Sequence, residues 1–167
     1  LGYYADAASL FQECIEYYGQ DETYNMQRGY VKSIEGLAWS YTKMNRVNES
    51  NQVLQTALRS VEKNNFSKLD GHYIVFKQGI NDYFLKNYNE AIHKIEQKLP
   101  FLYENEDFAW ATVGNFYIGQ SYWDMKEKEK AISYFEKVNQ VFEIKKYTHP
   151  DVRKSYELLI SQQTFKN

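Results

Sequence analysis

Apolar residues recur at intervals of three and four along most of the chain, the spacing that gathers them on one face of an α-helix. The pattern is clearest between Asn115 and Val138, which reads as two amphipathic helices folded back on each other. Gly119 lies in the first of these helices and Ala131 in the second, each flanked by large side chains. Because small residues let two helices approach closely while bulky neighbours fill the adjoining grooves, this stretch predicts a helical hairpin.

The same pattern occurs in earlier parts of the chain. About forty residues upstream it comprises Gly79, Ala91 and Ile95. About forty-one residues before those it comprises Leu37, Ala38, Tyr41, Ser50, Leu54 and Ala57. A partial copy near the start has Ala7, Phe11 and Cys14 at the spacing of Ala131, Phe135 and Val138. Internal repetition at this period predicts a solenoid of stacked helical hairpins.

This periodicity predicts about eight helices in one repeat domain spanning residues 1–167. They are a helix within 1–20, which would be the second helix of a truncated repeat, hairpins over 24–64, 67–104 and 106–145, and a terminal or capping helix over 148–165. The first helix should bury a stripe of Ala7, Leu10, Phe11, Cys14 and Ile15. Pro100 lacks the backbone N–H that a helix interior needs, so we expect the helix before it to end or kink near Lys98.

The repeated residues resemble the tetratricopeptide repeat family, whose mark is a Leu-Gly pair, a Tyr three positions on, and then an Ala and a Phe four residues apart. Ile118, Gly119, Tyr122, Ala131 and Phe135 match this mark, and the opening LGYYADAASLF resembles the family's turn and second helix. The resemblance implies an all-α, TPR-like α-solenoid, a right-handed superhelix of antiparallel hairpins. It also implies a protein-interaction module without catalytic activity.

Some positions depart from that family's pattern. The copies are longer than its usual repeat of about 34 residues, and Ile34, Val75 and Asn115 stand where the family has an early Trp. The chain begins at Leu1 inside a repeat, without an initiator Met or a signal-like segment. We interpret it as a fragment of a longer array, with surface at its ends that neighbouring repeats would cover.

Composition and charge narrow the function classes. The formal net charge of -2 and the pI near 6.0 provide no basic footprint, which argues against direct nucleic-acid contact by this segment. The sequence contains no apolar run of about 18 residues, so we expect no membrane span. Cys14 is the one cysteine, which excludes an internal disulfide and a thiolate metal cage.

Residues with catalytic or metal-binding chemistry form no recognisable motif. His72, His93 and His149 lie in different repeats, and no HExxH-like pair accompanies them. Cys14 occupies a small core position, which favours an inert thiol over a nucleophile. The alternating charges of residues 126–130 favour a solvated face with i,i+4 pairs. We therefore expect no enzyme activity, no cofactor and no metal.

The first helix of each hairpin should line the concave side of a solenoid, where ligands bind. The candidate peptide-binding residues on these helices are Lys32, Trp39, Lys43, Tyr73, Lys77, Tyr83, Phe84, Tyr117, Gln120 and Trp123. Aromatic rings with amide and charged groups suit a peptide groove, and the lysines could clamp a carboxylate or stay solvated. Phe76, Ile80 and Phe116 face the same side, with packing between repeats as the alternative.

The expected function is noncovalent binding of a protein or peptide, and homo-oligomerisation remains an alternative. KLPFLYENEDF and GQSYWDMKEKEKAISYFEKV also resemble the repeat arrays of bacterial regulators that precede an AraC-type helix-turn-helix domain. That resemblance covers 98–167 and implies a sensory or dimerisation segment of a transcription regulator, with the DNA-binding part outside this chain. We expect a cytoplasmic location, or a periplasmic one if the parent protein has a membrane span.

Overall fold

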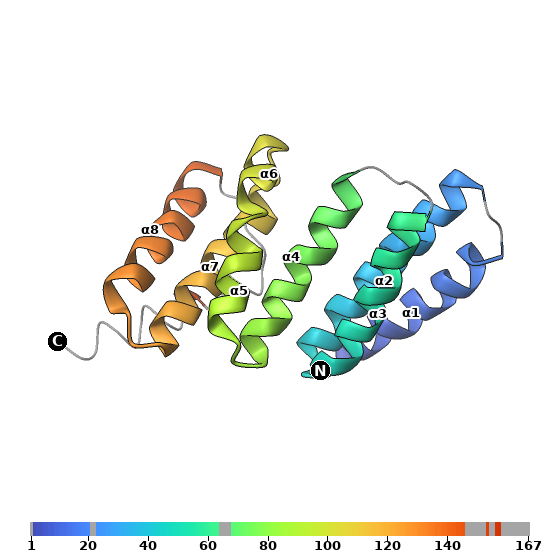
Figure 1. The fold of residues 1–167 in the computed structure, drawn as a ribbon, viewed down its shortest axis with the longest axis horizontal. Coiled ribbons are helices and arrows are strands. Elements are labelled where there is room, and N and C mark those ends of the chain that lie inside the picture. The colour runs from blue at the N-terminus through green and yellow to red at the C-terminus, as the bar shows by residue number, and fades with distance from the viewer. Residues whose placement is uncertain (1, 21–22, 64–67, 146–152, 154–155, 158–167) are drawn as a thin grey trace. The chain divides into compact units, whose positions relative to one another are not determined.

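The computed structural model describes residues 2–20, 23–63, 68–145, 153 and 156–157. Over these residues the fold is all-α, as predicted, with no strand (Figure 1). The helices are α1 (Gly2–Tyr18), α2 (Tyr24–Lys43), α3 (Val47–Lys63), α4 (Lys68–Phe84), α5 (Tyr88–Glu96), α6 (Leu99–Glu104), α7 (Phe108–Asp124) and α8 (Lys128–Lys145). Nearly all of the predicted terminal helix over 148–165 falls outside the described residues.

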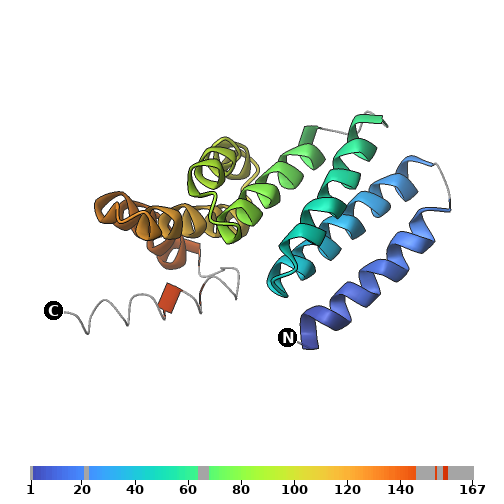
Figure 2. The same cartoon turned by 60° about the horizontal axis from the view of Figure 1, so that its bottom comes forward.

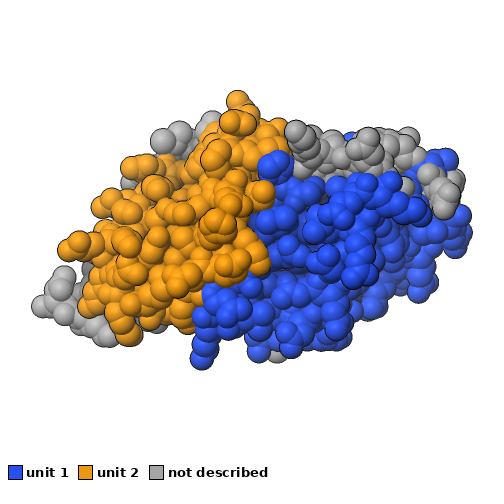
Figure 3. All heavy atoms as spheres, viewed as in Figure 1, with its two compact units in different colours: residues 1–87 blue, residues 88–167 orange. Residues whose placement is uncertain are grey.

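The chain divides into two compact units, residues 1–87 and residues 88–167, which Figure 3 shows in different colours. Unit 1 contains α1 to α4 and unit 2 contains α5 to α8. The predicted hairpin over 67–104 spans the boundary between these units. The pairing of the two helices of this hairpin and the right-handed superhelix therefore stay predictions. Inside each unit, the predicted packing of neighbouring helices is confirmed.

Unit 1 is a row of helices in which α1 packs on α2, α2 on α3 and α3 on α4 (Figure 2). Its main core joins Ile34 and Ala38 of α2 to Leu54 and Ala57 of α3 and to Ile74 of α4. A second cluster joins Ala8 of α1 to Leu37 and Tyr41 of α2, and Ile15 packs against both clusters. These helices form because their apolar residues repeat at helical spacing, and they stay in place because each apolar stripe is covered by its neighbour.

The predicted stripe of α1 is correct for Phe11 and Ile15, which pack on α2, and wrong for Leu10. Leu10 is exposed, and Ala8, which the prediction left out, is the buried residue of this helix. The reason is that, among the described residues, α1 packs mainly against α2, so only a narrow arc of its surface is covered.

In unit 2, α7 packs against α8, α5 and α6 (Figure 1). Every residue from Ala111 to Gly119 is buried, including the polar Thr112 and Asn115. A helix with neighbours on several sides is apolar nearly all round, and α7 has this character. The helix is therefore the centre of unit 2.

The small residues in the three full copies of the repeat pattern are buried, as predicted, whereas Ala7 of the partial copy is half-buried. Ala38, Ala57, Ala91 and Ala131 are inaccessible to solvent, and Gly119 is buried as well. The break near Lys98 is also confirmed, because α5 ends at Glu96 and α6 begins at Leu99 with Pro100 in its first turn.

Four helices end in the same left-handed turn. Asn45, Lys86, Glu106 and Lys126 have positive φ angles of 63°, 64°, 55° and 69°. In each turn the following N–H donates to a carbonyl five residues earlier, as from Arg46 to Tyr41 at 2.8 Å. This is the Schellman pattern, which normally places Gly at the left-handed position.

Two of these turns carry the same ion pair with its charges exchanged. After α2, Arg46 donates to the carboxylate of Glu49, and its guanidinium lies 4.3 Å from the ring centroid of Tyr41. After α7, at the equivalent repeat positions, Lys130 pairs with Glu127 and lies 5.1 Å from the ring centroid of Tyr122. The hydrogen bond from Arg46 lowers the pKa of Glu49. Both turns therefore hold a cation over the repeat tyrosine.

Candidate ligand-binding surface

The ten candidate residues lie on three helices. In unit 1, α2 carries Lys32, Trp39 and Lys43, and α4 carries Tyr73, Lys77, Tyr83 and Phe84. In unit 2, α7 carries Tyr117, Gln120 and Trp123. The contacts between α2 and α4 bring together the candidates of unit 1, whereas those of α7 form a separate group.

A charged cluster connects α2 to α4 and is built around Glu35. One carboxylate oxygen of Glu35 lies 3.1 Å from Lys77 Nζ, and the other lies 3.2 Å from Lys32 Nζ. Glu35 and Lys77 are buried, whereas the side chain of Lys32 is 43% exposed. Lys32 Nζ also lies 5.1 Å from the ring centroid of Tyr73. The cluster therefore shares one carboxylate between two ammonium groups and presents Lys32 and Tyr73 to solvent.

Half-buried aromatic rings lie on the same two helices. Lys43 Nζ lies 5.5 Å from the ring centroid of Trp39 on α2. On α4, the rings of Tyr83 and Phe84 meet edge to face at 5.3 Å. A ring that keeps part of its face accessible can stack on a ligand, and a lysine beside it adds a positive charge.

A buried polar network lies among α2, α3 and α4, and the sequence analysis missed its central residue, Asn81. Thr42 donates a hydrogen bond of 2.6 Å to the amide oxygen of Asn81, and its hydroxyl lies 2.8 Å from that of Ser50. The Asn81 amide donates to Ser50 and to Asn51 at 2.9 and 2.8 Å. The sequence does contain a signal for this network, because Ser50 stands at a repeat position that is Ala in the two later copies. A polar residue at a core position needs a partner, and this network supplies it.

The α7 candidates differ in accessibility. Tyr117 is buried, and its ring meets Phe116 edge to face at 5.4 Å, so its side chain offers a ligand little surface. Gln120 and Trp123 are half-buried. Lys128 Nζ lies 5.8 Å from the ring centroid of Trp123, so this ring also has a lysine beside it.

Three residues on the candidate face are core residues, which was the alternative to ligand contact given for them in the sequence analysis. Phe76 and Ile80 are inaccessible to solvent, and Phe116 is 6% exposed. Phe116 packs against Phe135 with ring centroids 6.4 Å apart. These side chains stabilise the units and do not reach a ligand.

A second aromatic cluster in unit 2 was not predicted. The rings of Tyr122 and Tyr134 stack at 5.8 Å, and the Tyr134 hydroxyl donates a hydrogen bond to Glu96 at the end of α5. Lys137 Nζ lies 4.0 Å from the Tyr134 ring centroid. Burial raises the pKa of Tyr134, and the Glu96 acceptor adds to this shift. The cluster ties α5 to α8, a contact that periodicity along one helix cannot reveal.

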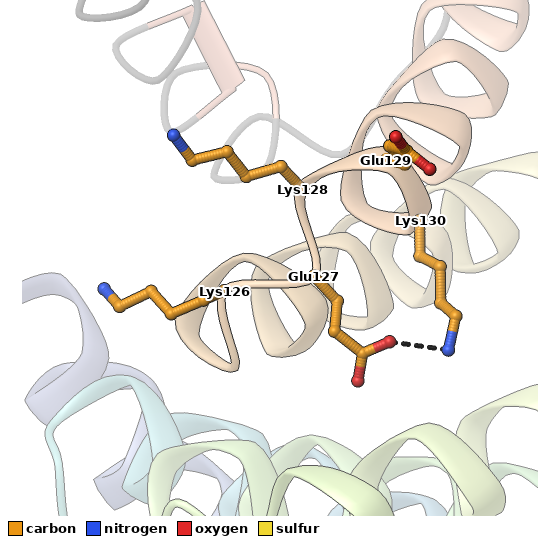
Figure 4. A pocket seen from close by; sticks show the side chains of 5 residues that line it. All are labelled: Lys126, Glu127, Lys128, Glu129 and Lys130. Atoms are coloured by element: carbon orange, nitrogen blue, oxygen red, sulfur yellow. Dashed lines mark ion pairs between the residues drawn. The ribbon is translucent and has the colours of Figure 1, made fainter.

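The turn between α7 and α8 forms a surface pocket of about 340 Å³, lined by residues 126–130 (Figure 4). All five side chains are exposed, which confirms the predicted solvated face. The ion pair joins Glu127 to Lys130 three residues later, and the predicted i,i+4 spacing was wrong here because the first residues form a turn. Figure 4 shows Lys126 and Lys128 extending away from this pair.

Residues with metal or nucleophile chemistry are dispersed. Among the described residues, no three His, Cys, Asp or Glu side chains are grouped so that they could hold a metal ion. His93 is exposed, with its Nε2 2.9 Å from the Gln97 amide, and His149 lies outside the described residues. Cys14 is half-buried on α1. No helix in the described part of the chain combines the length and hydropathy that crossing a bilayer requires.

Packed helix pairs with a recurring small-residue pattern define the class of α-helical repeat proteins. Residues 115–142 match the sequence profile of the tetratricopeptide repeat family, which supports assignment to the tetratricopeptide repeat superfamily. The matched stretch includes most of α7 and α8, with Gly119, Ala131 and Phe135. No curated protein matches the chain. The narrower resemblance to AraC-type regulators stays a prediction.

Proposed function

We propose that this chain binds a peptide or an extended protein segment noncovalently through the face formed by α2 and α4. The accessible residues of this face are Lys32, Trp39, Lys43, Tyr73, Tyr83 and Phe84. The observation that carries the proposal is the cluster around Glu35, in which one buried carboxylate faces the ammonium groups of Lys32 and Lys77. The tetratricopeptide repeat match supports a protein-interaction role.

The proposed ligand has acidic and apolar groups. Lys32 and Lys77 both contact the carboxylate of Glu35, and Lys43 places another ammonium group beside Trp39. A ligand carboxylate would approach Lys32, which is the accessible member of the cluster. The rings of Tyr73 and Trp39 would contact apolar side chains next to it. On α7 of unit 2, Gln120 and Trp123 offer similar side-chain chemistry.

The buried ion pair would act on Lys32 indirectly. Glu35 is held by Lys77, so its carboxylate has a fixed position from which it can orient the Lys32 ammonium. Fixing a binding group in advance reduces the entropy lost on binding. Lys77 therefore serves as a positioning residue in this proposal.

Binding can be tested with an array of synthetic peptides in which acidic, neutral and basic versions share the same apolar residues. The wild-type chain should retain acidic peptides that contain aromatic or aliphatic side chains. Lys32→Glu should weaken this binding at least about tenfold by replacing attraction with repulsion. Arg59→Glu is the matched control, because it reverses a positive charge in the same way at an exposed residue of α3, outside the proposed face.

Substitutions of the aromatic residues test the same proposal independently of charge. Trp39→Ala and Tyr83→Ala should each lose binding while circular dichroism shows unchanged helicity. Equal retention of acidic and basic peptides, or unchanged affinity in Lys32→Glu, would overturn the proposal.

A further inference from the structure

Three buried side chains from three helices of unit 1 form a closed ring of hydrogen bonds. Thr42 lies on α2, Ser50 on α3 and Asn81 on α4. The two hydroxyl oxygens are 2.8 Å apart, and the Asn81 amide lies 2.6 Å from Thr42 Oγ1 and 2.9 Å from Ser50 Oγ. Each of the three helices therefore contributes one side chain that bonds to the other two.

The donors in this ring follow from the groups available. Asn81 Nδ2 can only donate, and it bonds to Ser50 Oγ and to Oδ1 of Asn51. Asn81 Oδ1 can only accept, so it takes the single hydroxyl proton of Thr42, for which the carbonyl of Ala38 at 3.0 Å is a longer alternative. Ser50 then donates to Thr42, and all three bonds run in one direction around the ring. Hydrogen bonds linked in this way strengthen one another.

Asn81 differs from the residues at the same position of the other copies of the repeat. Two residues after the small residue of each copy stand Ser40 in α2, Asn81 in α4 and Ser121 in α7. All three are buried, but the hydroxyls of Ser40 and Ser121 donate to carbonyls four residues earlier in their own helices. Such a bond satisfies the side chain without a neighbouring helix. At Asn81 the partners come from α2 and α3 instead.

We propose that Asn81 is a positioning residue that fixes the register of α4 against α2 and α3, and with it the spacing of groups on the α2 and α4 face. Sliding α4 by one residue would move it about 1.5 Å and turn it by about 100°, which would carry the Asn81 amide away from its partners. Apolar contacts have no preferred direction and tolerate such a shift better. A single buried Asn specifies helix register in coiled coils by the same principle.

The ion pair of Glu35 and Lys77 also joins α2 to α4, but it restricts the register less. Lys77 reaches Glu35 through a flexible four-carbon chain, so its ammonium group can follow a displacement of the helix. The amide of Asn81 is held on one methylene group, and its planar donors and acceptor fix both distance and direction. Lys32 on α2 and Tyr73 on α4 depend on this register for their separation. This effect on the binding face rests on the proposed function, whereas the register itself does not.

The register can be measured without a ligand by pulsed electron paramagnetic resonance. Spin labels at Arg59→Cys on α3 and Gln78→Cys on α4, in a Cys14→Ser background, report the distance between these helices. This chain should give one narrow distance distribution. Asn81→Ser, which introduces the residue of the other two copies, should add a component displaced by about 5 Å or more, since a helix with its side chains is about 10 Å wide. Asn81→Leu, which keeps a branched side chain but has no polar atom, should do the same.

Ser40→Ala is the matched control, because Ser40 is the buried polar residue at the same repeat position and bonds within its own helix. It should keep the single distance, and circular dichroism checks that each variant is folded. A single unchanged distance in both Asn81 variants overturns the proposal. Loss of helicity in both also overturns it, because the ring would then be required for folding and not for register.

Peptide binding separates this inference from the proposed function. Asn81→Ser and Asn81→Leu should bind the acidic peptides of the array at least about tenfold more weakly than the wild-type chain. A displaced distance with unchanged affinity would overturn the effect of Asn81 on the binding face. If the wild-type chain bound no peptide, the proposed function would fail while the distance measurement still decided the register.

Discussion

The ring of Phe135 in α8 lies against the backbone of Gly119 in α7. A Cβ atom added to Gly119 would lie 2.5 Å from Cε1 of Phe135. The same relationship occurs in unit 1, where a Cβ on Gly36 of α2 would lie 2.3 Å from Cζ of Phe11 in α1. None of the described glycines has a positive φ angle. These two glycines are therefore needed for close approach of a ring and not for backbone conformation.

Gly119→Ala should destabilise the fold although Ala favours helix. Crowding of a packed core costs about 1–3 kcal/mol, which exceeds the gain of up to about 1 kcal/mol in helix propensity. Urea unfolding of the variant measures the difference. Gly71→Ala is the control, because a Cβ atom there would lie 4.0 Å from Val61 Cγ1, an ordinary van der Waals contact. It should raise the free energy of unfolding, and a Gly119→Ala variant as stable as wild type would contradict the packing argument.

Replacing the left-handed lysines with glycine should stabilise the chain. Lys86 and Lys126 have positive φ angles, which cost a side-chain-bearing residue about 1–2 kcal/mol. Both are exposed, so little packing is lost. Lys86→Gly and Lys126→Gly should each raise the free energy of unfolding by about 1 kcal/mol. Asn45→Gly should gain less, since Asn tolerates this conformation, and equal gains at all three sites would argue against relief of strain.

The buried pair of Glu35 and Lys77 should show strong coupling. Glu35→Leu withdraws a carboxylate from two ammonium groups and should cost about 3–5 kcal/mol. The double variant Glu35→Leu/Lys77→Met removes both buried charges and should be more stable than Glu35→Leu alone. A double-mutant cycle by urea unfolding measures this coupling, and additive effects of the two substitutions would show that the charges act independently.

Stability should fall at high pH because of the tyrosine cluster in unit 2. Burial and Glu96 raise the pKa of Tyr134 in the folded chain, whereas unfolded tyrosine titrates near pH about 10. A raised folded pKa contributes stability that is fully present below the unfolded pKa. This contribution is lost as pH rises through the folded pKa. The free energy of unfolding should therefore decline above pH about 10.

Urea titrations across this pH range test the assignment. Tyr134→Phe should make the decline shallower, because phenylalanine has no proton to lose. Tyr17→Phe, at an exposed tyrosine of α1, should keep the wild-type slope. If both substitutions changed the slope equally, the decline would not arise from the contact with Glu96.

Local pattern was sufficient to predict the helices and many of their packed positions. The helical period and the small residues Gly119 and Ala131 are visible in short stretches of sequence, and Pro100 predicted the break between α5 and α6. The exposure of Leu10 could not be predicted in this way. Its helical position suits burial, but burial also requires a neighbouring helix on that side.

The burial of each candidate side chain also could not be predicted from the sequence. Sequence pattern placed Lys77 and Tyr117 on helices that line the predicted concave side, and both side chains are buried. Glu35 and Asn81 acquire their partners from helices that are distant in sequence. A one-dimensional pattern can show which face a residue occupies, whereas its contacts depend on how neighbouring helices meet.

The exchanged ion pairs at the α2 and α7 turns have a consequence for comparing repeats. Arg46 matches Glu127 in position, and Glu49 matches Lys130, so column by column the two turns have opposite charge. The preserved feature is a cation over Tyr41 or Tyr122 together with a neutralising partner. Two substitutions made together can therefore keep the interaction, whereas either one alone would place like charges side by side. Aligning such turns by residue identity would classify them as divergent although they share one physical arrangement.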